Sequence, residues 1–392
     1  MNDSSPKLPN TIRPLAAAAL AALTCCGLGA CAAAKKADVP AAAEKPAAEA
    51  PVGGYALNNA HFLELGYARD WTAFPFIGSR QRLQILEPAG DVVIALETGS
   101  TVTALETSNG AIRWANELAN PLTRFVGVGR SGDSIQVSAD NEIWELASTS
   151  GSILKRQPYA RIVNTAAITV SGVLIYGSTT GHITSHRMDL GVERWSFLLR
   201  GAIDHKPVHV AGSGDDAIVG AVAQSGAFAF INAKTGRPTG RGEIFGGIDT
   251  DPIAAQGLMI VAGRDQSLWG IGTDGEVAWR LRCDLPLKQQ PATDGETVWC
   301  QLGTEGLSAV DAKTGKIIWS NRVVEGSVIG IRSGQLLVWN GTLALLLDKE
   351  RGDIVRSFVV PQTAMLKTDK FEDGNLYAVS DTGVVVRFVP RK

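Results

Sequence analysis

This sequence lacks an excess of positive or negative charge. Its 392 residues include 37 Lys and Arg and 39 Asp and Glu, so the formal net charge is −2 at pH 7. Proteins that bind nucleic acid generally carry a basic surface, because contacts with phosphate dominate their affinity. The composition therefore predicts neither a nucleic-acid partner nor a strongly acidic partner surface.

Motifs of catalysis and metal binding are also missing. The chain has no His-Glu-x-x-His, Cys-x-x-Cys, Gly-x-Ser-x-Gly or phosphate-loop sequence. A metal site needs several ligands, but the pairs His182 with His186 and His205 with His209 have no third partner. We interpret the following aspartates as turn residues that hydrogen-bond the backbone: Asp140, Asp265, Asp274 and Asp381. Neither a metal site nor a catalytic residue is predicted.

Long hydrophobic runs are absent except at the N-terminus, where residues 15–34 are uncharged and mostly apolar. Lys7 and Arg13 precede this run, as in an export signal. The run contains Leu28-Gly29-Ala30-Cys31, which is similar to the lipobox of bacterial lipoprotein precursors. That resemblance implies that residues 1–30 are a signal peptide and that Cys31 becomes the acylated first residue. The alternative is an uncleaved membrane helix, because residues 15–34 are long enough to span a bilayer.

The residues after Cys31 bear on where the protein is held. In the lipoprotein sorting rule of enteric-type bacteria, Asp at this next position retains a lipoprotein in the inner membrane. Ala32 stands there instead, so the resemblance implies the outer membrane, with the protein facing the periplasm. Residues 31–54 are rich in Ala, Pro, Lys and Glu, which predicts an extended tether. At about 3.1 Å per residue this tether reaches up to roughly 70 Å.

Cysteine is scarce in the rest of the chain. Of five cysteines, only Cys283 and Cys300 lie beyond Cys31. An oxidising compartment permits a disulfide between these two. Cys300 follows Trp299 in a predicted strand, so it is also compatible with a buried thiol. Both interpretations stay open at the level of the sequence.

Glycine, in contrast, is abundant, and it marks a repeat. Residues 303–319, GTEGLSAVDAKTGKIIW, contain two short apolar strands separated by glycine turns, followed by a third strand that ends in Trp319. Similar turn glycines recur at intervals of 37 to 45 residues: Gly110, Gly151, Gly191, Gly236, Gly275, Gly315 and Gly352. This period is typical of a four-stranded propeller blade. Helical repeats of similar length are less consistent with these glycine- and threonine-punctuated units.

The two ends of the repeat region supply one further blade. Residues 66–71 resemble the last strand of a blade, and residues 375–388 resemble a hairpin that lacks its last strand. Pairing these segments closes the ring without an exposed sheet edge. We therefore predict an all-β domain over residues 55–392, an eight-bladed β-propeller closed by its N- and C-terminal strands; seven blades are the alternative.

Tryptophans occur at one position of the repeat. Four of the nine follow a turn glycine at the same spacing, so we expect them to pack between blades rather than to form a sugar-binding platform. The pairs of turn glycine and Trp anchor are Gly110 with Trp114, Gly191 with Trp195, Gly275 with Trp279, and Gly315 with Trp319.

The segment 309–319, AVDAKTGKIIW, resembles the PQQ-type propeller repeat. With the lipobox, the tether and eight such repeats, the chain resembles the BamB family of outer-membrane assembly lipoproteins over about residues 60–390. This resemblance implies a monomeric, non-catalytic scaffold without a cofactor. Its partners would be assembly components or β-barrel precursors, and its only contact with the membrane would be the lipid.

Two points limit what the resemblance implies. Quinone-dependent dehydrogenases share this repeat, and an enzyme or ligand-binding propeller that uses the central channel is the alternative function. Such enzymes hold the quinone at an adjacent cysteine pair beside calcium, whereas the adjacent pair here, Cys25-Cys26, lies in the predicted signal peptide.

In the BamB family a connection carrying Leu and Arg docks the barrel insertase. Residues 198–201, LLRG, are similar to it but follow Trp195 directly, so that role is not assigned.

The lipobox leads to a first prediction. The Cys31→Ala variant should leave the membrane fraction, because it has no thiol to acylate. Fractionation of cells, followed by detection of the processed or full-length chain, measures this. A variant that stays membrane-bound at full length would instead support the uncleaved helix.

Overall fold

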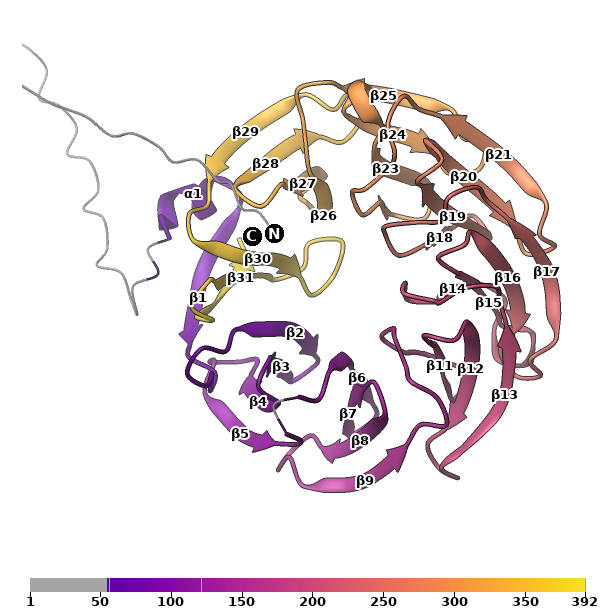
Figure 1. The fold of residues 1–392 in the computed structure, drawn as a ribbon. Helices are drawn as coiled ribbons and strands as arrows, with labels where there is room; N and C mark the ends of the chain where they lie inside the picture. The colour runs from indigo at the N-terminus through magenta and orange to yellow at the C-terminus, as the bar shows by residue number, and fades with distance from the viewer. Residues whose placement is uncertain (1–54, 56, 121, 392) are drawn as a thin grey trace, which may run out of the picture. The chain divides into compact units, whose positions relative to one another are not determined.

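The computed structural model describes residues 55, 57–120 and 122–391 (Figure 1). The predicted signal peptide, residues 1–30, and the predicted tether, residues 31–54, lie outside the described residues. The described residues form eight four-stranded antiparallel sheets that follow one another around a ring. The predicted eight-bladed β-propeller is therefore confirmed, and the seven-bladed alternative is not.

Seven blades are each built from four consecutive strands, numbered from the centre of the ring outward. Blades 1 to 4 are β2 (Leu83–Ala89), β3 (Val92–Glu97), β4 (Thr101–Glu106), β5 (Ile112–Glu117); β6 (Phe125–Ser131), β7 (Ser134–Ala139), β8 (Glu142–Ala147), β9 (Ile153–Pro158); β10 (Ile168–Val170), β11 (Val173–Gly177), β12 (His182–Arg187), β13 (Val192–Leu198); β14 (Val208–Ala211), β15 (Ile218–Val222), β16 (Ala227–Asn232), β17 (Pro238–Glu243). Blades 5 to 7 are β18 (Ile253–Ala255), β19 (Leu258–Gly263), β20 (Ser267–Gly272), β21 (Val277–Arg282); β22 (Ala292–Thr293), β23 (Thr297–Gln301), β24 (Leu307–Asp311), β25 (Ile317–Asn321); β26 (Ser327–Arg332), β27 (Gln335–Trp339), β28 (Leu343–Asp348), β29 (Ile354–Val359). Two 3-10 helices, Gly214–Asp216 and Gly303–Glu305, lie within turns.

The eighth blade combines both ends of the described chain. It contains β30 (Thr363–Thr368), β31 (Leu376–Ser380), β32 (Val385–Pro390) and, as its outer strand, β1 (Tyr67–Ala73). β1 is antiparallel to β32, with Tyr67 opposite Pro390 and Ala73 opposite Val385. Figure 1 shows this as an indigo strand beside yellow ones. The predicted closure of the ring by the two terminal strands is confirmed.

Helix α1 (Asn59–Glu64) secures this closure. Its buried residue Phe62 stacks on Phe388 of β32 with ring centroids 3.9 Å apart. Between blades 7 and 8, the Nε of Arg332 donates a hydrogen bond of 3.0 Å to the carbonyl of Gly66, and its Nη1 lies 2.6 Å from Asp373. Apolar stacking and a paired, nearly buried guanidinium therefore hold the outer strand in place.

The second strand of a blade is generally the most deeply buried. All residues of β3, β7, β11 and β31 are buried on both faces, because a neighbouring blade covers each face. These strands are accordingly rich in apolar residues, as in the run Val92–Leu96. Outer strands such as β9 and β29 are exposed over most of their length. The hydrophobic core is thus a ring of contacts between blades.

One contact between neighbouring blades recurs five times. A tryptophan of one outer strand donates its indole N–H to a carbonyl in the next blade at 2.9 Å, three residues before a turn glycine. These glycines have φ between 70° and 74°, and a Cβ on any of them would lie 2.4 to 2.7 Å from the indole. The tryptophan–glycine pairs are Trp71 with Gly110, Trp114 with Gly151, Trp195 with Gly236, Trp279 with Gly315, and Trp319 with Gly352. Each anchor therefore packs on the glycine of the following blade.

Three interfaces lack this contact: the one between blades 7 and 8, which Arg332 links, and two others. Between blades 4 and 5, Gly240 approaches the backbone of Asp274 and Gly275 directly. Between blades 2 and 3, Lys155 of β9 occupies the repeat position of the tryptophan, and its Nζ lies 3.4 Å from the carbonyl of Met188, three residues before Gly191. Gln157 donates a hydrogen bond of 2.9 Å to the same carbonyl. The side chain of Lys155 therefore takes the place that an indole occupies at five other interfaces.

The tryptophan–glycine contact leads to a second prediction. Gly315→Ala should lower the thermal midpoint more than Gly334→Ala. Both glycines have positive φ, 70° and 76°, but only at Gly315 would the new methyl group meet an indole. The shared backbone penalty is about 1–2 kcal/mol, and overpacking adds about 1–3 kcal/mol at Gly315 alone. Thermal melts of the two variants isolate the packing contribution, and equal midpoints would contradict it.

Candidate functional site

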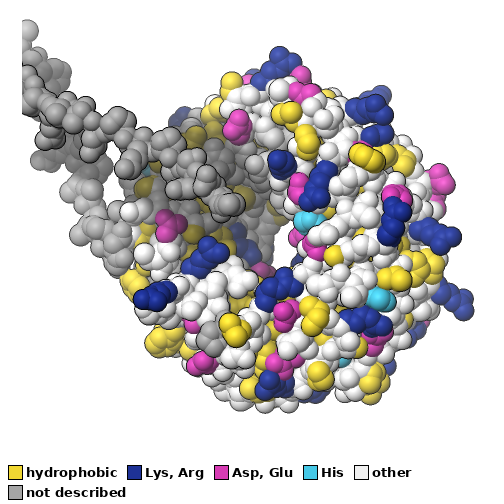
Figure 2. Space-filling model, in the orientation of Figure 1, with side chains coloured by type: hydrophobic (Ala, Val, Ile, Leu, Met, Phe, Trp, Pro, Cys, Tyr) yellow, Lys and Arg dark blue, Asp and Glu magenta, His cyan; other side chains and the backbone are white. Residues whose placement is uncertain are grey.

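The antiparallel blades divide the propeller into two faces. The first-to-second turn of every blade and the third-to-fourth turns of blades 1 to 7 lie on one side, which we call the turn face. The second-to-third turns and the connections between blades lie on the opposite side, which we call the connection face. An opening lies at the centre of the ring, and acidic and basic side chains are interspersed around it (Figure 2).

The connection face exposes a large apolar side chain at or beside each of the eight connections. Three of these side chains, Leu122 at 93%, Phe245 at 85% and Val323 at 79%, are the most exposed large apolar residues of the described chain. We call the whole set the apolar rim: Phe74, Phe76, Leu122, Ile162, Leu198, Phe245, Leu285, Val323 and Val359. Single exposed apolar residues are ordinary on protein surfaces, but here one recurs at or beside every connection, so a partner that spans neighbouring connections would cover more than one of them.

Hydrogen bonds between neighbouring connections hold this face. Arg124 donates to the carbonyl of Val163 at 3.1 Å, and the backbone N–H of Lys206 donates to Asp251 at 2.9 Å. The backbone N–H of Asp251 in turn donates to Gln290 at 3.0 Å. These bonds link connections that lie about one repeat apart in the sequence, so the loops that carry the apolar rim are fixed to one another.

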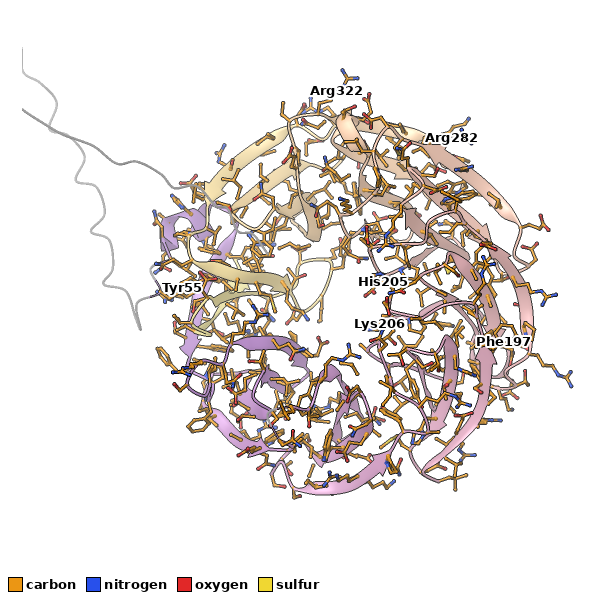
Figure 3. All side chains as sticks on the ribbon, viewed as in Figure 1. Tyr55, Phe197, His205, Lys206, Arg282 and Arg322 are labelled. Carbon is orange, nitrogen blue, oxygen red and sulfur yellow. The ribbon has the colours of Figure 1, made fainter. Side chains whose placement is uncertain are left out.

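Charged groups line the inner side of the same connections. His205 and Lys206 lie beside the central opening (Figure 3), and His205 Nδ1 is 3.4 Å from Asp251. Hydrogen bonds from Arg264 hold the pKa of Asp249 below its ordinary value. A groove of about 470 Å³ follows the inner strands here and includes Lys206, Val208 and Ile253. Figure 3 also shows Arg282 and Arg322 at the outer edge of the ring.

The chain enters the propeller at the connection face. Tyr55, the first described residue, is buried, and its hydroxyl lies 2.5 Å from the hydroxyl of Thr363. Thr363 is the first residue of β30, directly after the connection between blades 7 and 8. Burial raises the pKa of Tyr55 to about 12, so the phenol remains a neutral hydrogen-bonding group at physiological pH.

The aspartates and histidines considered in the sequence have separate structural partners. Asp265 accepts hydrogen bonds from Trp269 and Arg280, and Asp274 accepts one from the backbone of Glu276. His186 is buried, contacts Gln157 at 2.8 Å, and has its pKa lowered by that burial. Within residues 55, 57–120 and 122–391, no three His, Cys, Asp or Glu side chains gather to hold a metal ion.

The two remaining cysteines lie in one apolar cluster with Val298 and Leu302. Cys300 is buried and Cys283 is half-buried, and both are free thiols. The disulfide that the sequence left open is therefore not formed in this structure. Burial raises the pKa of the Cys283 thiol to about 11 and raises that of Cys300 further. Such thiols are poor nucleophiles.

The sequence of the propeller was compared with known protein families. The model of the family described as outer membrane protein assembly factor BamB matches residues 79–202, 179–320 and 271–386. This chain belongs to the BamB family. The matched segments overlap and cover the propeller from the start of blade 1 into blade 8. Among curated proteins, no sequence matches the chain.

Two solved structures share the BamB-family fold at low identity. The crystal structure of BamB from Moraxella catarrhalis is 20% identical, covers 81% of this chain and 98% of its own, and has a TM-score of 0.60. The computationally designed protein Ika8 is 11% identical, covers 82% and 99%, and has a TM-score of 0.67. Both likenesses concern the fold. Among the described residues of this BamB-family chain, no helix has the length and hydrophobicity to cross a membrane.

The cysteine environment leads to a third prediction. In the native mature protein at pH 8, Cys283 and Cys300 should react slowly with a thiol reagent, because their pKa values lie above that pH. Unfolding without reductant should then release two reactive thiols per chain. Counting modified thiols by mass spectrometry measures both states, with Cys283→Ser as the control that lowers the count by one. A count of zero after unfolding would establish the disulfide instead.

Proposed function

We propose that this chain is a non-catalytic scaffold of outer-membrane protein assembly that binds protein partners. A lipid on Cys31 anchors it to the outer membrane, and the propeller faces the periplasm. The observation that carries the proposal is membership of the BamB family over residues 79–386. The apolar rim adds a surface on which partner proteins bind.

The rim has the properties of a binding surface. Its side chains lie at or beside all eight connections, so they are distributed around the ring rather than gathered in one patch. Burying apolar surface favours complex formation, but area does not convert directly into affinity because association also loses translational and rotational freedom. Partners that cover several rim residues at once therefore gain affinity without a deep pocket. Because hydrogen bonds already fix the connections, little conformational entropy is lost on binding.

The first described residue lies at the same face as the rim. Tyr55 contacts Thr363 at the connection face of blade 8, and the predicted tether precedes Tyr55 in the sequence. A tether of this length lets the propeller meet partners held in or near the membrane. The segment Leu198–Gly201 contributes Leu198 to the apolar rim. In the same segment, Arg200 forms an ion pair with Glu243 of blade 4.

The hydrogen bonds of the candidate catalytic aspartates and histidines support a non-catalytic role. Asp265 and Asp274 hold turns and side chains through their own hydrogen bonds. His186 is buried against Gln157. None of these groups presents an unpaired base or nucleophile to the central opening. Repeat glycines and tryptophans likewise have packing roles between blades.

The proposal leads to a fourth prediction. A chain carrying both Leu122→Asp and Phe245→Asp should recover outer-membrane assembly proteins at least tenfold less well than the wild type. Two charges on the rim must lose their hydration when a partner covers them. The measurement is affinity purification of the full lipoprotein from detergent-solubilised envelope, with mass-spectrometric quantification of co-purifying assembly proteins.

The matched control is Val277→Asp. Val277 is 47% exposed, but it is the first residue of β21, at the turn face of blade 5 and outside the rim. This variant should recover partners as the wild type does, and all variants should keep the wild-type thermal midpoint. Equal recovery by the rim variant would contradict the docking role of the rim. Stoichiometric retention of pyrroloquinoline quinone with calcium, together with substrate-dependent dye reduction, would overturn the non-catalytic assignment.

A further inference from the structure

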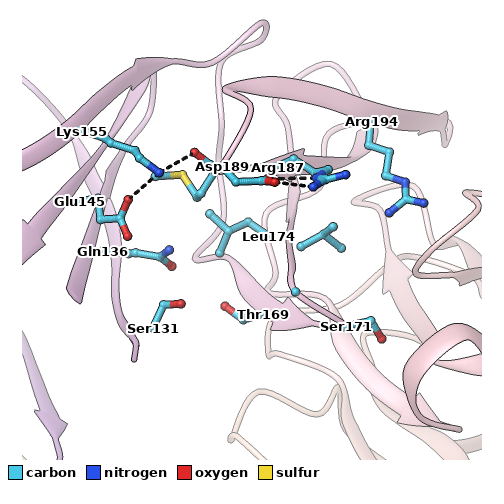
Figure 4. A pocket seen from close by; sticks show the side chains of 13 residues that line it. Ser131, Gln136, Glu145, Lys155, Thr169, Ser171, Leu174, Arg187, Asp189 and Arg194 are labelled. Atoms are coloured by element: carbon cyan, nitrogen blue, oxygen red, sulfur yellow. Dashed lines mark hydrogen bonds and ion pairs between the residues drawn. The ribbon is translucent and has the colours of Figure 1, made fainter. Parts of the chain in front are cut away.

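A polar cleft opens on the turn face between blades 2 and 3 (Figure 4). Its volume is about 480 Å³, which lies within the usual range of binding pockets. The cleft lies at one of the three interfaces that lack the tryptophan contact, where Lys155 stands at the repeat position that a tryptophan occupies at five others. The space beside its slender side chain is the cleft.

The wall from blade 2 carries three polar side chains in one row. Gln136, Glu145 and Lys155 are cross-strand neighbours on β7, β8 and β9. Lys155 Nζ lies 3.6 Å from Glu145 Oε2, and Glu145 Oε1 accepts a hydrogen bond from Ser134 at 2.8 Å. The row therefore presents an amide, a carboxylate and an ammonium group to the cleft.

Gln136 has unused hydrogen-bonding capacity in this row. It is only 7% exposed, and no described group hydrogen-bonds its side-chain amide, which lines the cleft. Glu145 Oε2 is buried, and its charge is balanced by Lys155 Nζ at 3.6 Å. Polar side chains with so little exposure are nearly always paired in folded proteins. The unpartnered amide of Gln136 therefore indicates a ligand that supplies both a donor and an acceptor.

The wall from blade 3 adds positive charge. Arg187 is paired with Asp189, whereas Arg194 is exposed and pairs with no described residue. The cleft thus has three cationic side chains against two carboxylates, an excess of one positive charge. Leu174 forms an apolar part of the same wall. This combination suits a ligand with one negative charge and neutral polar groups.

We propose that this cleft binds an acidic side chain and the adjoining backbone of an extended segment of a protein partner. The segment's carboxylate pairs with Arg194, and its backbone N–H and carbonyl groups bond the amide oxygen and amide nitrogen of Gln136. A phosphate ion can also pair with Arg194, and it carries P–OH donors at neutral pH. We favour a peptide because the proposed scaffold function supplies protein partners, and competition with phosphate tests that choice.

The inference rests on the proposed scaffold function and extends it to a second surface. The cleft lies on the turn face and the apolar rim on the connection face. A partner held at the rim therefore leaves the cleft accessible. The two surfaces differ in chemistry as well as in place, so a change in one can be tested without a change in the other.

The probe for a binding test is a fluorescent, capped octapeptide of alternating Gly and Glu, compared with the same peptide of Gly and Gln. Fluorescence anisotropy with the mature chain should show at least tenfold tighter binding of the Glu peptide. Arg194→Gln should remove this preference. Arg237→Gln is the matched control, because Arg237 is exposed in a turn of blade 4 outside the cleft. It should bind both peptides as the wild type does.

A second variant tests the contribution of the buried row. Gln136→Leu keeps the size of the side chain but removes its amide, so it should weaken both peptides by the same factor. The Arg194→Gln test stays valid if this buried change impairs folding, because Arg194 is exposed. Unchanged binding by Arg194→Gln, or equal wild-type affinity for the two peptides, would overturn the proposal.

Competitors identify the class of ligand, and a rim variant separates the two proposals. Complete displacement of the Glu peptide by equimolar inorganic phosphate or galacturonate would overturn the peptide assignment in favour of a small anion. The double variant Leu122→Asp, Phe245→Asp should bind the Glu peptide normally. Loss of co-purifying partners with intact peptide binding supports both surfaces, whereas absent peptide binding with intact co-purification refutes the cleft alone.

Discussion

Ring closure by β1 and β32 is the constraint on which the rest of this structure depends. Joining the first and last strands fixes the positions of all eight blades, and it removes the exposed edge that an open array would leave. The stacked rings of Phe62 and Phe388 and the bonds of Arg332 reinforce the same junction. Because the two strands come from opposite ends of the domain, closure carries a large loss of chain entropy. The buried contacts between blades offset that loss.

The repeated tryptophan–glycine contact explains both the regularity of the ring and one of its exceptions. An indole donates to the next blade and lies against a glycine that has no Cβ, which sets the spacing of neighbouring outer strands. Where Lys155 replaces the indole, the neighbouring outer strands remain linked through Gln157, but a polar cleft opens. A local change in one repeat thus converts a packing position into a surface that can recognise a ligand.

Connections and turns give the propeller two chemically different surfaces. The connection face carries the apolar rim and receives the chain at Tyr55. The turn face carries the cleft with its excess positive charge. Since the blades are rigid sheets, neither surface needs to rearrange for the other to bind. This separation suits a protein that brings several partners together, as the proposed scaffold function requires.

The sequence by itself determined the repeat and the closing strands, and it predicted eight blades with seven as the alternative. The structure decided the count. Turn glycines such as Gly315 and anchors such as Trp319 are local signals, because positive φ and aromatic packing restrict single positions. Tertiary structure decided which residues meet. Trp279 packs on Gly315 of the next blade, and Cys283 and Cys300 remain thiols, although their spacing allowed a disulfide. Each rim residue is one apolar side chain in a loop, without a periodic pattern to reveal it. Gln136 and Arg194 lie far apart in the sequence, and only the packing of blade 2 against blade 3 places both in one cleft.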